Sequence, residues 1–141
     1  LLDEVVLRWA GGTTGVRQAC PGLVEQIEAG ALDTPETLAL LEDFLQPLLA
    51  ARADTIVLGC THYPFVAPQI QRLAGPDVRL IDAAPAVARQ AARVLAERGL
   101  RNPDSARTGR ICYATTGERA TLARLLELLR LPPGTVSEAR I

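Results

Sequence analysis

The ten residues Thr55-Ile56-Val57-Leu58-Gly59-Cys60-Thr61-His62-Tyr63-Pro64 carry the most information in this chain. Their first four residues are apolar or β-branched, which predicts a short, buried strand of a parallel sheet. A helical pattern follows, and open α/β sheets place their chemistry where such a strand turns into a helix. Cys60 and His62, the only histidine, lie on this turn, so a thiol and an imidazole are available there for proton transfer or nucleophilic attack.

Short apolar segments alternate with helical patterns along the rest of the chain. Further strands are expected at residues 78–81, 110–114 and 135–141, and helices at residues 1–10, 23–29, 33–51, 64–73, 85–98 and 119–131. This alternation predicts an α/β fold with a mainly parallel sheet flanked by helices. The best candidate boundary lies near Pro85, which separates residues 1–84 from residues 85–141.

Size and composition indicate an ordinary globular protein. The chain has 141 residues, of which 48% are apolar and 22% charged, and its formal net charge is −1. This balance argues against a nucleic-acid partner or a basic membrane-binding surface. The sequence contains no apolar run of membrane-spanning length and no recognisable signal peptide, so a cytoplasmic location is expected.

Cysteine and lysine usage narrow the possible chemistry. The three cysteines, Cys20, Cys60 and Cys112, form no Cys-x-x-Cys pair, so neither a structural metal site nor a redox dithiol is expected. Cys20 and Cys112 are interpreted as packing residues. The chain has no lysine, because all fifteen of its basic residues are arginine. It therefore cannot hold pyridoxal phosphate as a Schiff base, and any amino-acid chemistry would need no such cofactor.

The turn after the strand has the features of a site for an acidic substrate. The backbone amides of residues 61–65 begin a helix, and the positive end of a helix binds anions and lowers the pKa of a nearby thiol. Thr61 offers a hydroxyl group, and His62 can hydrogen-bond to Cys60 or to the substrate. The alternative is structural. A cysteine beside an apolar strand is usually a small core residue, and a single histidine near a strand end is often a hydrogen-bonded structural group.

Residues 58–64 resemble the second catalytic signature of the glutamate racemases, in the aspartate/glutamate racemase superfamily. Three other segments resemble the same family in the same order. They are Ala19-Cys20-Pro21 with Glu28-Ala29-Gly30 downstream, Leu80-Ile81-Asp82 with Ala86-Val87-Ala88 downstream, and Cys112-Tyr113-Ala114-Thr115-Thr116-Gly117.

The resemblance implies a cofactor-independent enzyme that interconverts L- and D-glutamate and supplies D-glutamate for peptidoglycan. In the family, two cysteines face opposite sides of the substrate α-carbon, and one removes a proton while the other delivers one. By this resemblance Cys60 is one of the two proton carriers, Thr61 and His62 hold the substrate, and Glu28 is a possible supporting residue.

Only about half of the family's pattern is found in this chain. The first-half segment of Ala-Cys-Asn-Thr type and the early Asp-Ser-Gly turn are missing, and the first residue is Leu1. The resemblance therefore implies a fragment in which residues 1–84 are the incomplete second α/β domain and residues 85–141 return to the first domain. The isolated chain is expected to be inactive. It is also expected to be poorly stable, to form an oligomer such as a homodimer, or to bind its missing N-terminal half.

Two alternatives remain open at this point. The first is a related racemase or isomerase that acts on aspartate, hydantoins or maleate, although His62 and the pair Tyr63-Pro64 favour glutamate. The second is a non-catalytic, truncated module that binds an acidic ligand or a partner through the amides at Thr61 and His62.

Overall fold

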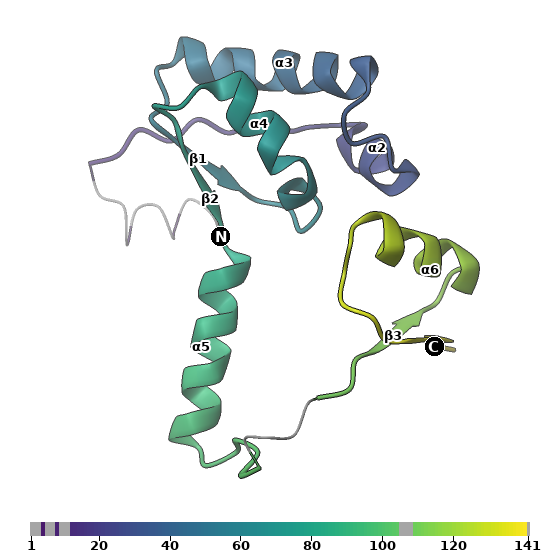
Figure 1. Cartoon of the computed structure of the whole chain (residues 1–141). Coiled ribbons are helices and arrows are strands. Elements are labelled where there is room, and N and C mark those ends of the chain that lie inside the picture. The colour runs from purple at the N-terminus through teal and green to yellow at the C-terminus, as the bar shows by residue number, and fades with distance from the viewer. Residues whose placement is uncertain (1–3, 5–7, 9–11, 105–108, 141) are drawn as a thin grey trace.

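Two pairs of parallel strands form the β structure of the residues described by this computed structural model, which are Glu4, Arg8, 12–104 and 109–140 (Figure 1). Strand β1 (Thr55–Leu58) pairs with β2 (Arg79–Asp82), and β3 (Cys112–Thr115) pairs with β4 (Thr135–Glu138). The expected α/β class with parallel strands is confirmed. Most of the helix expected over residues 1–10 lies outside the described residues.

The hydrophobic core lies between β1 and four helical segments of the first half. These are α2 (Leu23–Ala29), α3 (Pro35–Ala50), the 3₁₀ helix η1 (Tyr63–Val66) and α4 (Ala67–Ala74). In Figure 1, α2, α3 and α4 lie on one side of β1 and β2. Each of these elements contributes at least one side chain that is almost completely buried. The buried apolar residues are Leu23, Ile27, Leu41, Leu45, Ile56, Leu58, Val66 and Ile70.

Strand β1 is buried on one face only. Ile56 and Leu58 point into the core, whereas Val57 between them is 63% exposed. The expectation of a fully buried strand is therefore wrong for one of its faces. Alternate side chains of a strand point to opposite faces, and the core helices pack against the Ile56 side.

Helix α3 begins where the sequence predicts. The backbone N–H of Thr37 donates to the Thr34 hydroxyl at 3.3 Å, and Pro35 occupies the first turn, where its missing N–H costs nothing. Thr37 is completely buried, and its own hydroxyl donates to the carbonyl of Ala31 at 2.5 Å. This bond ties the start of α3 to the loop that follows α2, and so fixes the position of α2 beside the core.

The helix expected at residues 64–73 consists of two parts. It begins as the 3₁₀ helix η1 and continues as α4. Pro64 and Pro68 both lack an N–H, and each lies in the first turn of its element, where no helical hydrogen bond is lost.

The second half of the chain leaves this core and then returns to it. Helix α5 (Ala84–Glu97) projects from the end of β2 and has no buried residue (Figure 1). After β3, helix α6 (Arg119–Leu128) reaches the end of α2, where Gly30 closes that helix with φ +83°. A Cβ atom on Gly30 would collide with the side chain of Leu128, so the two halves are in close contact at this point.

Candidate functional site

The turn after β1 brings the thiol of Cys60 and the imidazole of His62 together. The backbone N–H of Tyr63 donates to the carbonyl of Cys60 at 3.3 Å, which opens η1 directly after the cysteine. This turn places Cys60 Sγ 3.8 Å from His62 Nδ1. Cys60 is half-buried, and Thr61 is exposed between the two residues. The turn thus keeps the thiol accessible from one side and in contact with a proton acceptor on the other.

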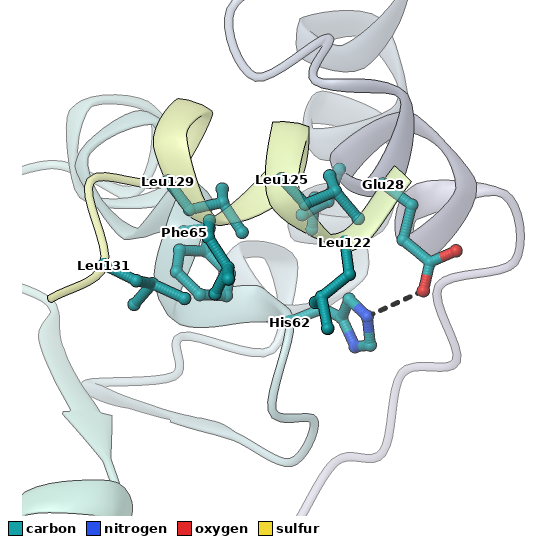
Figure 2. Close-up of a pocket in the computed structure, with 9 residues that line it drawn as sticks. Glu28, His62, Phe65, Leu122, Leu125, Leu129 and Leu131 are labelled. Carbon is teal, nitrogen blue, oxygen red and sulfur yellow. Dashed lines mark hydrogen bonds and ion pairs between the residues drawn. The ribbon is translucent and has the colours of Figure 1, made fainter. Parts of the chain in front are cut away.

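Glu28 completes the site from the last turn of α2. Its Oε1 lies 3.0 Å from His62 Nε2, and the side chains of His62 and Glu28 are 33% and 56% exposed (Figure 2). An ionised carboxylate only accepts hydrogen bonds, so Nε2 carries the hydrogen that joins the two residues. In the neutral imidazole, Nδ1 is then the unprotonated nitrogen, and it faces the Cys60 thiol. Cys60, His62 and Glu28 form a line of thiol, base and orienting carboxylate.

Cys20 and Tyr63 lie beside this line. Cys20 packs against the core, as expected, and its thiol donates to the backbone carbonyl of Gln18 at 3.8 Å. Burial raises the pKa of Cys20, and the nearby polar side chain of Tyr63 partly opposes the rise. Burial, together with the nearby thiols of Cys20 and Cys60, raises the pKa of Tyr63 to about 12. The sequence pointed to Tyr63 only as part of the Tyr63-Pro64 pair that favours glutamate, and did not place its side chain beside Cys20.

Cys112 is not a packing residue. It is exposed on β3, whose half-buried side chains are Tyr113 and Thr115. The interpretation of Cys112 as a packing residue is therefore wrong, because the alternation along β3 turns it away from the covered face.

A mostly apolar pocket of about 260 Å³ adjoins the His62–Glu28 pair. Leucines of α6 and of the segment after it form one wall, and Ile27 and Phe65 contribute to another (Figure 2). Leu122 and Leu131 line the same pocket as His62 and Phe65 (Figure 2). Sequence reasoning missed this wall, since the leucines of α6 read only as one face of an amphipathic helix.

Other kinds of site find little support in the described residues. These residues contain no group of three or more His, Cys, Asp or Glu side chains arranged to hold a metal ion. None of the helices in the described part of the chain combines the length and the hydrophobicity needed to cross a bilayer.

Comparisons with known proteins agree on one family. Residues 10–91 match the family Asp/Glu/Hydantoin racemase. The chain is 53% identical over its whole length to a glutamate racemase of Roseiflexus sp. (strain RS-1), covering 52% of that protein. It is 47% identical to a glutamate racemase of Herpetosiphon aurantiacus, with 92% of the chain matched to 50% of that protein.

Solved structures of glutamate racemases have the same fold. The crystal structure of a glutamate racemase isoform from Bacillus anthracis matches 99% of this chain over 52% of its own length. The TM-score is 0.85 and the sequence identity is 26%. The structure of the Thermus thermophilus enzyme, solved in complex with β-chloro-D-alanine, matches 88% of this chain over 47% of its own length. Its TM-score is 0.76 and the sequence identity is 32%. The chain spans about half the length of the curated relatives and structures it matches. By its sequence and its fold, this chain belongs to the Asp/Glu/Hydantoin racemase family.

Proposed function

We propose that this chain is part of a glutamate racemase that interconverts L- and D-glutamate without a cofactor. The observation that carries the proposal is the line formed by Cys60, His62 and Glu28, with Sγ 3.8 Å from Nδ1 and Nε2 3.0 Å from Oε1. The relatives named above are glutamate racemases, which supports glutamate rather than aspartate, a hydantoin or maleate as the substrate.

The line accounts for proton transfer at one face of the substrate. His62 Nδ1 accepts the proton of the Cys60 thiol, and the Glu28 carboxylate stabilises the resulting imidazolium. The thiolate then removes the α-proton of glutamate and becomes a thiol again. In the opposite direction of racemisation, the Cys60 thiol delivers its proton to the planar carbanionic intermediate. The α-proton passes from the glutamate Cα to Cys60 Sγ while the first thiol proton stays on His62 Nδ1, and the reverse steps return both protons. No electron is gained or lost, and the second carrier serves the other face of the substrate.

Positioning supplies part of the required rate. The α-proton of an amino acid is very weakly acidic, and good orientation contributes up to about 7–11 kcal/mol to lowering a barrier. Fixed hydrogen-bond donors contribute further by stabilising the negative charge that develops in the transition state. The exposed hydroxyl of Thr61 is the side-chain donor on this turn that can bind a substrate carboxylate. Both ring nitrogens of His62 face Cys60 and Glu28, so in this proposal His62 acts through Cys60 and does not bind the carboxylate itself.

The second proton carrier belongs to a complementary half of the enzyme, which in this proposal also completes the fold. Apolar side chains on β1 and α5 are open to solvent, with Val57 63% and Val87 66% exposed. We assign residues 1–84 to the domain that carries Cys60, and residues 85–141 to a segment that joins the complementary half. The isolated chain has one proton carrier and is therefore inactive. In this proposal, the complete enzyme supplies D-glutamate for peptidoglycan in the cytoplasm.

A panel of substrates tests this proposal with the full-length protein. L-glutamate, D-glutamate, L-aspartate, a 5-substituted hydantoin and maleate are incubated separately, without added pyridoxal phosphate. Optical rotation follows the chiral substrates, and the loss of maleate is followed by its absorbance. The proposal predicts loss of optical rotation from both enantiomers of glutamate at least tenfold faster than turnover of the other substrates. Turnover of another substrate with none of glutamate would reject it.

A further inference from the structure

A threonine buried in the core joins α3 to the end of α2. Thr37 is 0% exposed, and it is the only buried polar residue in the described part of the chain. Its hydroxyl donates to the carbonyl of Ala31 at 2.5 Å and accepts the hydroxyl of Thr34 at 3.2 Å. Valine has the same shape and would pack there without any hydrogen bond, so the hydroxyl serves the contact with Ala31 rather than the packing.

Ala31 is firmly attached to α2. Its backbone N–H donates to the carbonyl of Gln26 at 2.9 Å, and the N–H of Gly30 donates to the carbonyl of Ile27 at 3.0 Å. The left-handed backbone of Gly30 permits both bonds, as is common at the glycine end of a helix. Glu28 lies inside the turn that these bonds close. The bond to the Ala31 carbonyl therefore holds the part of α2 that carries Glu28.

The apolar core alone leaves one motion of α2 open. The buried residues of this helix are Leu23 and Ile27, which are four positions apart and lie on one stripe of its surface. Contacts along one stripe set the depth of the helix but resist rolling about that stripe only weakly. Glu28 is about 100° further around the helix than Ile27, so rolling moves its carboxylate relative to His62. A hydrogen bond has a preferred direction, which apolar contacts lack, so the bond from Thr37 opposes the rolling.

We propose that Thr37 is a positioning residue for the proton-transfer site and that it fixes the rotation of α2 at which Glu28 meets His62. It acts through the Ala31 carbonyl and exchanges no proton with the substrate. The contact that it maintains is the one of 3.0 Å between Glu28 Oε1 and His62 Nε2, which leaves Nδ1 free to accept the thiol proton. The inference rests on the proposed function only in that it takes Cys60 to be the proton carrier.

The reactivity of Cys60 toward iodoacetamide, measured from pH 6 to pH 10 in this 141-residue chain, tests the proposal. The thiolate is the reactive form, and its fraction at pH 7 depends on the imidazole that Glu28 orients. Above the ordinary cysteine pKa of about 8.5, the thiolate forms without that help. A lost orientation therefore slows alkylation at pH 7 and leaves it unchanged at pH 10, whereas loosened packing alters the rate at every pH.

Three substitutions at Thr37 separate its hydroxyl from the rest of the side chain. Thr37→Val keeps the shape, Thr37→Ala introduces the best helix-forming residue, and both remove the hydroxyl, whereas Thr37→Ser keeps it. All three keep the backbone N–H that donates to Thr34 and caps α3. Leu45→Val is the matched control, because Leu45 is a buried residue of the same helix that shares a pocket with Leu73 of α4.

Each variant is checked by circular dichroism, and alkylation of each cysteine is resolved by peptide mass spectrometry. Alkylation of Cys112, which is exposed on β3, is the internal reference. The substitutions at position 37 leave in place the other titratable groups around the Cys60 turn, which are His62, Tyr63, Cys20, Glu25 and Glu28.

We expect Thr37→Val and Thr37→Ala each to slow alkylation of Cys60 at pH 7 by about three- to tenfold, the range that corresponds to one lost hydrogen bond. At pH 10 both stay within about twofold of the unaltered chain, as Thr37→Ser and Leu45→Val do at either pH. In a Glu28→Ala background, Thr37→Val has no further effect, because the hydroxyl acts only through that carboxylate.

The opposite results would overturn the proposal. They are an unchanged rate at pH 7 in both hydroxyl-free variants, equal slowing at pH 7 and pH 10, or a full effect of Thr37→Val in the Glu28→Ala background. Slowing by Thr37→Ser or Leu45→Val as large as that by Thr37→Val would also reject it. If neither hydroxyl-free variant folds, the proposal fails too, because the hydroxyl then supports the whole fold and not the site.

This result is independent of racemase activity, since alkylation needs neither glutamate nor a complementary half. If the predicted alkylation pattern is found and the full-length protein does not racemise glutamate, the proposed function alone is rejected. If the full-length protein racemises glutamate and Cys60 reactivity is indifferent to the Thr37 hydroxyl, the positioning role alone is rejected.

Discussion

His62 Nε2 lies 3.0 Å from Glu28 Oε1, although the two residues are 34 positions apart in the sequence. The contact joins the last turn of α2 to the turn that carries Cys60. It also decides which nitrogen of His62 is free to accept a proton, because the carboxylate binds the protonated one. The direction of proton transfer in the proposed reaction thus depends on a contact between two distant segments.

Replacement of Glu28 by glutamine tests this contact. Glu28→Gln keeps the size of the side chain but removes the charge that stabilises the His62 imidazolium. In the full-length protein we expect kcat to fall about tenfold with little change in KM, a modest loss because both side chains are partly exposed to solvent.

Glu36→Gln is the matched control for this experiment. Glu36 is an exposed glutamate in the first turn of α3, and its substitution leaves kcat unchanged within about twofold. Equal rates for the Glu28 and Glu36 variants would show that the carboxylate of Glu28 takes no part in the reaction.

Gly30 tests the contact between α6 and α2. Gly30 and Gly22 both have a left-handed helical backbone, with φ +83° and +82°, so alanine at either position costs about 1–2 kcal/mol of unfolding free energy. A Cβ atom at Gly30 would also collide with the Leu128 side chain, whereas a Cβ atom at Gly22 would make only an ordinary contact with Leu40 at 3.9 Å. Urea denaturation should show that Gly30→Ala costs up to about 1 kcal/mol more than Gly22→Ala, because Leu128 must move.

Removal of the Leu128 side chain should cancel that difference. In a Leu128→Ala background, Gly30→Ala and Gly22→Ala are expected to destabilise the chain equally, because the colliding atoms are gone. If Gly30→Ala remains the more damaging change in this background, the extra cost does not come from the contact with α6.

Alkaline pH should destabilise the folded chain through Tyr63. Its folded pKa of about 12 lies above the ordinary tyrosine value of about 10. The folded state therefore binds more protons than the unfolded state in this window, and the free energy of unfolding falls as the pH rises from about 10 toward 12. Cys20, whose pKa is also raised, starts the decline at lower pH.

The comparison of Tyr63→Phe with Tyr113→Phe isolates this contribution. The Tyr113 hydroxyl donates to the carbonyl of Pro132 on the other side of the molecule. Urea midpoints measured between pH 9 and pH 11.5 should decline less steeply for Tyr63→Phe than for Tyr113→Phe. Identical slopes for the two variants would contradict the shifted titration of Tyr63.

The exposed apolar surface predicts self-association of the isolated chain. Val57 on β1 and Val87 on α5 are both more than 60% exposed, and a half-sheet leaves strand edges unpaired. Sedimentation velocity is expected to detect dimers or larger species at micromolar concentration, and Val57→Thr should weaken them. A well-folded monomer with a cooperative unfolding transition would count against this prediction.

Local signals in the sequence predicted the strands and the Cys60 turn. The apolar run before Gly59 and the prolines after His62 act within a few residues, so their effect can be read from the sequence itself. The resemblance to the racemase family, which the comparisons confirm, also depended mainly on residues 58–64. Glu28 was named only through that resemblance, because nothing local links a glutamate on α2 to a histidine 34 residues later.

Features that depend on tertiary packing could not be predicted. Cys20 and Tyr63 come close together because α2 and η1 pack on one core. The leucine wall beside His62 exists because the chain returns after α5 and brings α6 to α2. The exposure of Val57 and Cys112 likewise reflects which faces other elements cover, which no short-range pattern determines.

The measurement that addresses the role of Cys60 most directly is deuterium exchange at the α-carbon of glutamate. The full-length protein is incubated with L-glutamate in D₂O, and the α-proton signal is followed by NMR for the unaltered protein, Cys60→Ala and Cys112→Ala. We expect exchange with the unaltered protein and with Cys112→Ala, and a loss of at least a thousandfold with Cys60→Ala. Exchange at the full rate by Cys60→Ala would contradict the account.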